Sequence, residues 1–271
     1  MTSLVVRRAQ GLVTVQDEGR PGFMHLGLPP GGPLAPSRFG LANAAVGNGP
    51  GDACVEVIGE FIVCAQDGPV WVAADGDAAT RLRPGEEFAV GSSKSARVRY
   101  LAVRGGFDVP VVFGGRGTLL VAGLGGLEGR ILRRGDVLPV GSPELSGREA
   151  RAPSASVQPS DTVRVVGGPD GDADLLAQFL ATRYIVSARA DRIGVRLEGP
   201  PLLWRSRPGP RASTPMVAGA IEVPGDGVPI VLGPDHPTTG GYPVVAVVVR
   251  AELERVVAAP LGTELRFFAS H

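Results

Sequence analysis

One short segment, residues 234–243, combines an acid, an imidazole and a phenol within ten positions. It reads Pro-Asp-His-Pro-Thr-Thr-Gly-Gly-Tyr-Pro and lies between two apolar runs that are predicted to be strands. Asp235 and His236 have the acid–base capacity that proton transfer requires, and Tyr242 adds a phenol. We therefore take Asp235, His236 and Tyr242 as candidate catalytic residues.

The middle of the same segment is suited to binding. The hydroxyls of Thr238 and Thr239 and the backbone amides of Gly240 and Gly241 can hold an anionic or carbonyl oxygen. Two adjacent glycines also allow the backbone to approach a ligand closely. The alternative is a capped turn that performs no chemistry, and the residues alone leave both interpretations open.

The charge balance excludes several classes of function. Lys+Arg and Asp+Glu both number 27, so the chain has no positive excess with which to bind nucleic acid or an anionic membrane. No apolar stretch reaches 18 residues, the length needed to span a membrane. The apolar stretch among the first residues is too short for the core of a secretion signal. We therefore expect a cytoplasmic protein with no membrane partner. The three histidines are scattered, and no metal site is predicted.

The remaining sequence predicts a mainly β protein. Glycine and proline number 40 and 25 and separate short apolar runs along the whole chain, as turns between strands do. The predicted strands are residues 4–6, 12–15, 54–58, 61–64, 70–73, 88–90, 97–103, 163–166, 184–186, 195–197, 221–223, 230–232, 244–249 and 265–268. Barrels or sandwiches with a few peripheral helices are the expected architecture.

Helices and a linker complete the predicted organisation. Proline and serine open a helix over 36–46 that glycine 47 ends, and apolar spacing predicts helices over 173–181 and 252–257. Residues 141–160 are rich in Ser, Pro and Ala with few large apolar side chains, which is typical of a linker or exposed loop. We expect two β-rich halves, residues 1–140 and 161–271.

Several ordered sequence blocks resemble the biotin-dependent carboxyltransferase family that includes allophanate hydrolase subunit 2. The segment around Asp235 is similar to its D-x-x-T-T-G-G-Y-P signature. The other similar blocks are residues 14–22, 41–48, 101–110, 116 and 187–197. This resemblance implies a cyclophilin-like β-barrel architecture. It also implies a B-type partner subunit (allophanate hydrolase subunit 1) that completes the active site.

The resemblance adds two arginines to the candidate substrate-binding residues. Arg116 falls in a block that resembles G-S-R-S-T, and Arg192 falls in one that resembles S-D-R-x-G. Either guanidinium can hold a carboxylate or carbonyl oxygen. For Arg192 the alternative is a structural ion pair with Asp191 or another acid.

The resemblance is compatible with three interpretations of the activity. The first is the C subunit of an ATP-dependent 5-oxoprolinase, an amide-bond hydrolase that uses ATP with Mg and acts on a lactam or amide together with the B-type and a third, A-type, subunit. The second is the carboxyltransferase part of a biotin-dependent urea or amide carboxylase. The third is a regulatory protein that binds a B-type kinase inhibitor without catalysis. Lys94 is the only lysine and lies in no Met-Lys-Met context, so covalent biotin on this chain is not expected.

Several positions depart from the family pattern. Gly115 and Gly117 replace the two serines of G-S-R-S-T. Gly32 and Ala35 stand in a segment where the family has a serine and an acid, Thr214 replaces an acid, and Pro237 replaces a common glutamine. If those groups bind substrate in relatives, the substrate or the strength of the activity differs here.

Overall fold

The computed structural model describes residues 2–142, 160–170, 173–204 and 212–270. The chain divides into two compact units, one made of Met1–Pro21 and Gly31–Val157 and the other of Gly22–Pro30 and Gln158–His271. The second unit thus includes a segment from early in the sequence, which contains the short 3-10 helix η1 (Met24–Leu26). Most of the linker predicted over 141–160 lies outside the described residues.

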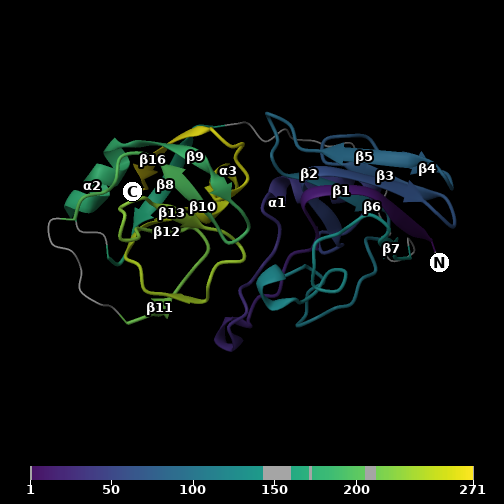
Figure 1. Cartoon of the computed structure of the whole chain (residues 1–271), viewed down its shortest axis with the longest axis horizontal. Helices are drawn as coiled ribbons and strands as arrows, with labels where there is room; N and C mark the ends of the chain where they lie inside the picture. Colours follow the sequence, from purple (N-terminus) through teal and green to yellow (C-terminus); the bar gives the residue numbers. More distant parts are fainter. Residues whose placement is uncertain (1, 143–159, 171–172, 205–211, 271) are drawn as a thin grey trace. The chain divides into compact units, whose positions relative to one another are not determined.

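The first unit is built on a seven-stranded antiparallel sheet. The order is β4-β3-β6-β2-β1-β7, and β5 pairs with β2 (Figure 1). Its strands are β1 (Ser3–Gln16), β2 (Cys54–Ala65), β3 (Val70–Ala74), β4 (Thr80–Leu82), β5 (Glu87–Gly91), β6 (Arg99–Val103) and β7 (Val137–Pro139). Alternate apolar side chains of these strands form one buried cluster that includes Val13, Val57 and Leu101.

Helix α1 (Pro36–Val46) has the bounds predicted from the sequence. Proline lies in its first turn, and Gly47 ends it in the left-handed region with φ 78°. The N-cap residue Ala35 makes no side-chain cap; instead its N–H donates to the hydroxyl of Tyr100 over 3.0 Å. That hydroxyl donates in turn to Glu56, 2.5 Å away. A second 3-10 helix, η2 (Leu120–Ala122), lies in the same unit.

The second unit is a closed seven-stranded barrel with the order β10-β13-β12-β15-β8-β16-β9 (Figure 1). Its strands are β8 (Thr162–Gly167), β9 (Arg183–Ala190), β10 (Gly194–Glu198), β12 (Ala220–Glu222), β13 (Ile230–Leu232), β15 (Val244–Val248) and β16 (Glu264–Ala269). All neighbours are antiparallel except β16, which runs parallel to β8. The mainly β fold with a barrel and few helices is confirmed.

Two helical segments pack on this barrel. Phe179 of α2 (Ala173–Ala181) stacks on Tyr184 with ring centroids 5.2 Å apart and lies 4.8 Å from Phe267, so aromatic contacts join the helix to β9 and β16. The helix predicted over 252–257 is instead a 3-10 turn, η4 (Arg250–Glu252), followed by the short helix α3 (Glu254–Val257). Outside the barrel, β11 (Thr214–Pro215) and β14 (Thr239–Gly240) form a separate two-stranded sheet.

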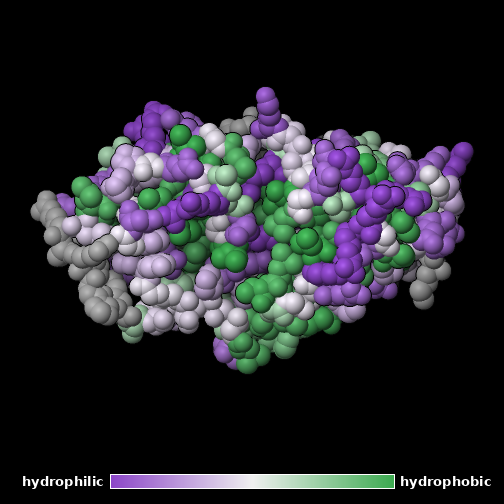
Figure 2. Space-filling view, in the orientation of Figure 1, coloured by the Kyte–Doolittle hydropathy of each residue, from purple (hydrophilic) through white to green (hydrophobic). Residues whose placement is uncertain are grey.

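Apolar side chains gather on one face of the first unit (Figure 2). Four large hydrophobic residues between positions 111 and 121 are exposed, namely Val111, Phe113, Leu120 and Val121. Val121, with 73% of its surface accessible, is the most exposed of the four. Within the described part of the chain, no helix has the length and apolar character needed to cross a membrane.

Candidate functional site

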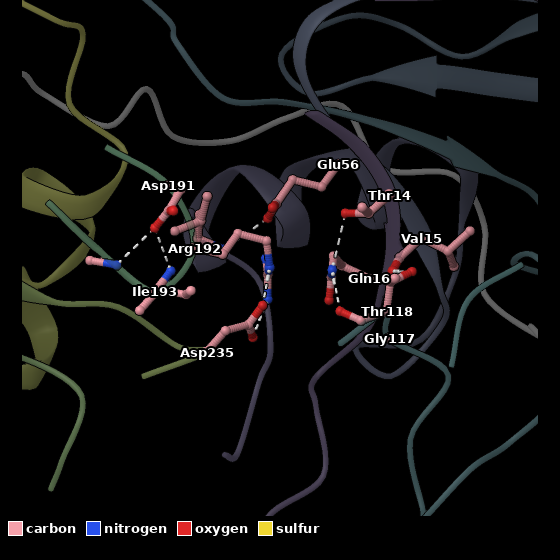
Figure 3. Close-up of polar contacts among 12 residues, drawn as sticks. Thr14, Val15, Gln16, Glu56, Gly117, Thr118, Asp191, Arg192, Ile193 and Asp235 are labelled. Atoms are coloured by element: carbon pink, nitrogen blue, oxygen red, sulfur yellow. Dashed lines mark hydrogen bonds and ion pairs between the residues drawn. The ribbon is translucent and has the colours of Figure 1, made fainter. Parts of the chain in front are cut away.

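Arg192 lies at the tip of the β9–β10 hairpin. The Asp191 carboxylate accepts the N–H groups of Ile193, 2.8 Å away, and Gly194, 3.1 Å away, which fixes the turn (Figure 3). The Asp191 carboxylate is therefore hydrogen-bonded to the backbone of its own turn. The Arg192 side chain extends toward Asp235, and only 3% of it is exposed.

Asp235 follows β13 and forms a two-point ion pair with Arg192. The distances are 2.7 Å from Nε to Oδ2 and 2.9 Å from Nη2 to Oδ1, and 6% of the Asp235 side chain is exposed. The backbones of the two segments are also joined, because the Asp235 N–H donates to the Arg192 carbonyl and the Gly233 N–H to that of Ile193. The structure thus brings together two predicted site residues that are 43 positions apart. In this geometry both carboxylate oxygens of Asp235 hold the guanidinium, and a role in proton transfer stays a prediction.

His236 is buried beside this pair, with 1% of its surface exposed. Its Nδ1 lies 2.8 Å from the carbonyl oxygen of Pro237. Since a carbonyl oxygen only accepts, we assign the ring proton to Nδ1, which leaves Nε2 as the basic nitrogen. Pro237, one of the positions that depart from the family pattern, therefore supplies the group that orients the imidazole.

The threonines and glycines of the segment form strand β14 and the residues beside it. Gly240 pairs with Thr214 and Thr239 with Pro215, and the N–H of Met216 donates to the Thr238 carbonyl over 3.0 Å. Thr214, a second departing position, thus lies directly opposite Gly240. Thr239 and Gly241 are exposed, whereas Thr238 and Gly240 are half-buried.

Tyr242 is separated from this buried group. It is 53% exposed, in contrast to Asp235 and His236. The phenol is thus available to solvent or to a partner, and its predicted catalytic role stays a prediction.

A buried acid beside Gly240, Glu222, was not predicted from the sequence. Glu222 is the last residue of β12 and is 7% exposed. Its Oε1 lies so close to Gly240 that a Cβ built on that glycine would be only 2.7 Å from it. The neighbouring apolar cluster consists of Met216, Ala220, Leu232 and Val244. Burial in these surroundings raises the pKa of the Glu222 carboxyl, because desolvation disfavours its charged form.

The raised pKa of Glu222 gives a testable dependence of stability on pH. The folded chain holds this proton more tightly than the unfolded chain, so stability falls as pH rises from the unfolded value, about 4.3, to the folded pKa. Glu222→Gln removes this titration. We expect the free energy of unfolding of the variant, relative to the unsubstituted chain, to increase between pH 4 and pH 8 in urea titrations. The exposed Glu198→Gln change is the control and should leave the difference flat; a flat difference for Glu222→Gln as well would contradict the assignment.

Arg116 belongs to the first unit and is positioned by Asp17. The Asp17 carboxylate is 6% exposed and accepts the backbone N–H groups of Gly19, Arg116 and Gly117. The guanidinium of Arg116 donates to the Val109 carbonyl and lies 3.2 Å from Asp108, with about a third of the side chain exposed. Arg116 is therefore held by its own unit and is partly open to solvent.

The segments around Gln16 and Thr118 are joined by side-chain hydrogen bonds. Gln16 donates from Nε2 to Thr14 and to the Thr118 carbonyl, each over 3.1 Å (Figure 3). A Cβ on Gly117 would lie 2.8 Å from the Gln16 side-chain oxygen and 3.0 Å from Asp17 Oδ1, so a larger residue here would displace these two side chains. Gly117 is thus explained by close packing against Gln16 and Asp17. Among the described residues, no group of three or more His, Cys, Asp or Glu side chains is arranged to hold a metal ion.

Comparison with models of known protein families supports the resemblance seen in the sequence. The model of the carboxyltransferase domain, subdomains A and B, matches residues 26–269. The chain belongs to this carboxyltransferase-domain family. The match spans the Arg192–Asp235 pair, Glu222 and the β14 segment in the second unit as well as Arg116 in the first.

Several proteins are similar to this carboxyltransferase-domain chain. The C subunit of 5-oxoprolinase from Escherichia coli K12 is 32% identical over 283 residues, covering 97% of this chain and 90% of that protein. A urea amidolyase of Lachancea kluyveri is 32% identical over 299 residues, covering 94% of this chain but 16% of the amidolyase. Among solved structures, Kluyveromyces lactis urea carboxylase superposes with a TM-score of 0.88 at 28% identity, covering 99% of this chain and 27% of that one. The relatives are thus an enzyme subunit and regions of larger enzymes.

Proposed function

We propose that this chain is the C subunit of an ATP-dependent 5-oxoprolinase, which activates and hydrolyses the amide bond of a lactam. The observation that carries the proposal is the end-to-end correspondence with the E. coli protein, of which the chain covers 90%. The urea amidolyases, by contrast, correspond to this chain over only 16% of their length. The E. coli relative is itself a subunit, which supports action within a multi-subunit enzyme, with a B-type and an A-type subunit as partners.

The second unit supports this chemistry with polar groups, of which Arg192, Asp235 and His236 are buried. An amide is a poor electrophile, and its activation requires positioned donors near the carbonyl oxygen. We propose Arg192, Thr238, Thr239 and the amides of Gly240 and Gly241 as substrate-binding groups. In the first unit, taken by itself, we propose Arg116 as a substrate-binding residue. His236, Asp235 and Tyr242 are the proposed catalytic residues.

ATP and its Mg are proposed for the assembled enzyme. The described residues of this chain offer no acidic cluster suited to a metal ion, so we assign no step of the reaction to a metal on this chain. Covalent biotin is not part of the proposal, since Lys94 is the only lysine. We place the enzyme in the cytoplasm, without a nucleic-acid or membrane partner.

The exposed apolar residues 111–121 support a protein partner, because such groups on a surface mark interaction sites. Val121→Asp puts a charge at the most exposed of them. We expect the variant to bind the B-type subunit at least about ten-fold more weakly, as measured by calorimetry. Leu261→Asp, at an exposed turn of the second unit, is the matched control and should bind normally. Normal binding by Val121→Asp would remove this face from the interface.

The function is tested by co-expressing the chain with B-type and A-type subunits and measuring glutamate released from 5-oxoproline. The proposal expects release that requires ATP and all three subunits. A second candidate, the carboxyltransferase part of a urea or amide carboxylase, is favoured by the urea amidolyases that resemble 94% of this chain. Carboxylation of urea that depends on an added biotin carrier, without glutamate release, would select it. Tight binding to the B-type protein without either turnover would instead indicate a regulatory protein.

The loop is tested in the active complex with Asp235→Asn and Tyr242→Phe. Each change removes an ionisable group while nearly preserving the shape of the side chain. Turnover unchanged in both variants would remove these side chains from the chemistry.

A further inference from the structure

An open pocket of about 390 Å³ lies at one end of the sheet of the first unit. The residues that line it come from the starts of β1 and β3 and from the ends of β6 and β7, and they include Thr2, Val70, Trp71, Arg104 and Val140. The volume falls within the range of roughly 300–1,000 Å³ that is typical of small-molecule sites. None of these residues belongs to the site proposed above for the amide substrate.

Trp71 gives this pocket a flat apolar wall. Val70 and Val72, its neighbours along β3, are part of the buried core of the first unit. Because side chains alternate along a strand, Trp71 points to the opposite face of the sheet, and 41% of its surface is exposed. The indole is therefore available to stack on a planar ring.

Two arginines flank Trp71 on the neighbouring strands. Arg81 of β4 lies directly opposite Trp71 in the β3–β4 register. On the other side of β3, Val72 pairs with Val103 of β6, and the next residue, Arg104, donates its N–H to the Trp71 carbonyl over 2.9 Å. Residues that lie opposite each other on adjacent strands share one face of the sheet. The indole thus lies between two guanidinium-bearing residues.

These two arginines are not neutralised by acids. Within the described part of the chain, neither Arg81 nor Arg104 forms an ion pair, and the buried Nε of Arg104 has no hydrogen-bond partner. The lining of the pocket includes no acid. Asp67, which is close in sequence, accepts the hydroxyl proton of Ser3 over 2.6 Å. Since a buried N–H without an acceptor is unfavourable, the pocket favours a ligand that brings an anionic oxygen to Arg104.

We propose that this pocket, the Trp71 pocket, binds an organic anion that carries a flat ring. The ring stacks on the indole of Trp71, and Arg104 donates to the carboxylate or phosphate oxygens of the ligand. Arg81 adds a weaker attraction from the solvent-exposed side. Binding is reversible and changes no covalent bond. The site goes beyond the proposed function and does not depend on it.

Trp71 itself reports on binding. In the full chain with Trp204→Phe it is the only tryptophan, so a ring stacked on it should change its fluorescence in a saturable way. The probes are benzoate and AMP, which join a ring to a carboxylate or a phosphate, and acetate and inorganic phosphate, which have no ring. We expect a ring-bearing anion to bind at least about ten-fold more tightly than its ring-free counterpart. Tighter binding of benzoate assigns the pocket to aromatic carboxylates, and tighter binding of AMP assigns it to nucleotides.

Substitutions test each part of the pocket. Arg104→Gln should weaken binding of the tighter ring anion about ten- to hundred-fold, as the loss of a charge-assisted hydrogen bond implies. Arg81→Gln should weaken it roughly two- to five-fold. Trp71→Leu, followed by calorimetry, should remove the preference for the ring-bearing anion. Arg134→Gln is the matched control and should bind normally, because Arg134 is an exposed arginine of the same unit that does not line the pocket.

Three results would overturn the inference. They are no saturable binding of benzoate or AMP at millimolar concentration, equal binding of ring-bearing and ring-free anions, and equal binding by Arg104→Gln and Arg134→Gln. The comparison of ligands uses no substitution in the pocket, so it decides the matter even if Arg104→Gln does not fold. No partner subunit is needed for these measurements. Their failure therefore leaves the proposed 5-oxoprolinase activity untouched, and absence of that activity leaves the Trp71 pocket standing.

Discussion

Replacing Arg192 with leucine is expected to lower the free energy of unfolding of the barrel by about 3–5 kcal/mol. The change leaves the Asp235 carboxylate in a site that is 6% exposed, without the guanidinium that now contacts both of its oxygens. An uncompensated buried charge is costly, and here the β9–β10 turn and the loop after β13 would also lose the contact that joins their side chains.

The measurement uses the distribution of the two tryptophans. Trp204 lies in the second unit and Trp71 in the first, so urea unfolding followed by Trp204 fluorescence in a Trp71→Phe background reports on the barrel. The double variant Arg192→Leu/Asp235→Leu should be less destabilised than Arg192→Leu alone, because no charge remains buried. Arg183→Ala breaks an exposed pair with Glu264 and serves as the control, with little change expected. A small effect of Arg192→Leu would show that the buried pair does not form.

Replacing Asp17 with alanine is expected to cost about 3 kcal/mol or more in the first unit. Its carboxylate accepts three backbone N–H groups, from Gly19, Arg116 and Gly117, and each buried donor left unpaired costs roughly 1–3 kcal/mol. The loop that carries Arg116 would then lose its fixed position. We therefore expect turnover of the complex to fall together with stability.

This effect can be separated from the loss of the Arg116 ion pair. Asp108→Ala removes the surface carboxylate that contacts Arg116, and since that carboxylate is 60% exposed we expect a change within about 0.5 kcal/mol. Unfolding is followed by Trp71 fluorescence in a Trp204→Phe background. Equal stability of the Asp17→Ala and Asp108→Ala variants would refute the scaffolding role of Asp17.

The local signals in the sequence were sufficient for the helices over 36–46 and 173–181 and for most strand positions. Proline at the start of α1 and glycine after its end act within a few residues, so no tertiary information was needed. The strand predicted over 97–103 begins at Arg99, and two pairs of predicted strands merged. Residues 4–6 and 12–15 are one strand, β1, and residues 54–58 and 61–64 are β2.

The predicted strands are continuous in β1 and β2 because two glycines pair with each other across these strands. Gly11 and Gly59, which read as turns in the sequence, are partners in the β1–β2 register with φ of +90° and +130°. A side chain on either would collide with the backbone of the opposite strand. They therefore allow two long strands to continue past each other, which only the paired structure reveals.

The candidate site was predictable in part. Asp235, His236 and the Thr-Thr-Gly-Gly segment stood out because their types are concentrated in one loop. The partner of Arg192 was not predictable, because the residues are 43 positions apart and Asp191 was an equal candidate. Glu222 alternates with Ile221 and Val223, which predicts a solvent-facing acid; its burial depends on the separate β11–β14 sheet and on Met216.

The closure of the barrel has a consequence for biosynthesis. Strand β16 pairs with β8 on one side and β9 on the other, so residues 264–269 are required to join two edges from earlier in the chain: Arg266 pairs with both Thr162 and Arg183. During translation those edges emerge from the ribosome first and stay open until residue 269 has left the exit tunnel. In this interval the unpaired edges of β8 and β9 are surfaces of the kind that promote aggregation.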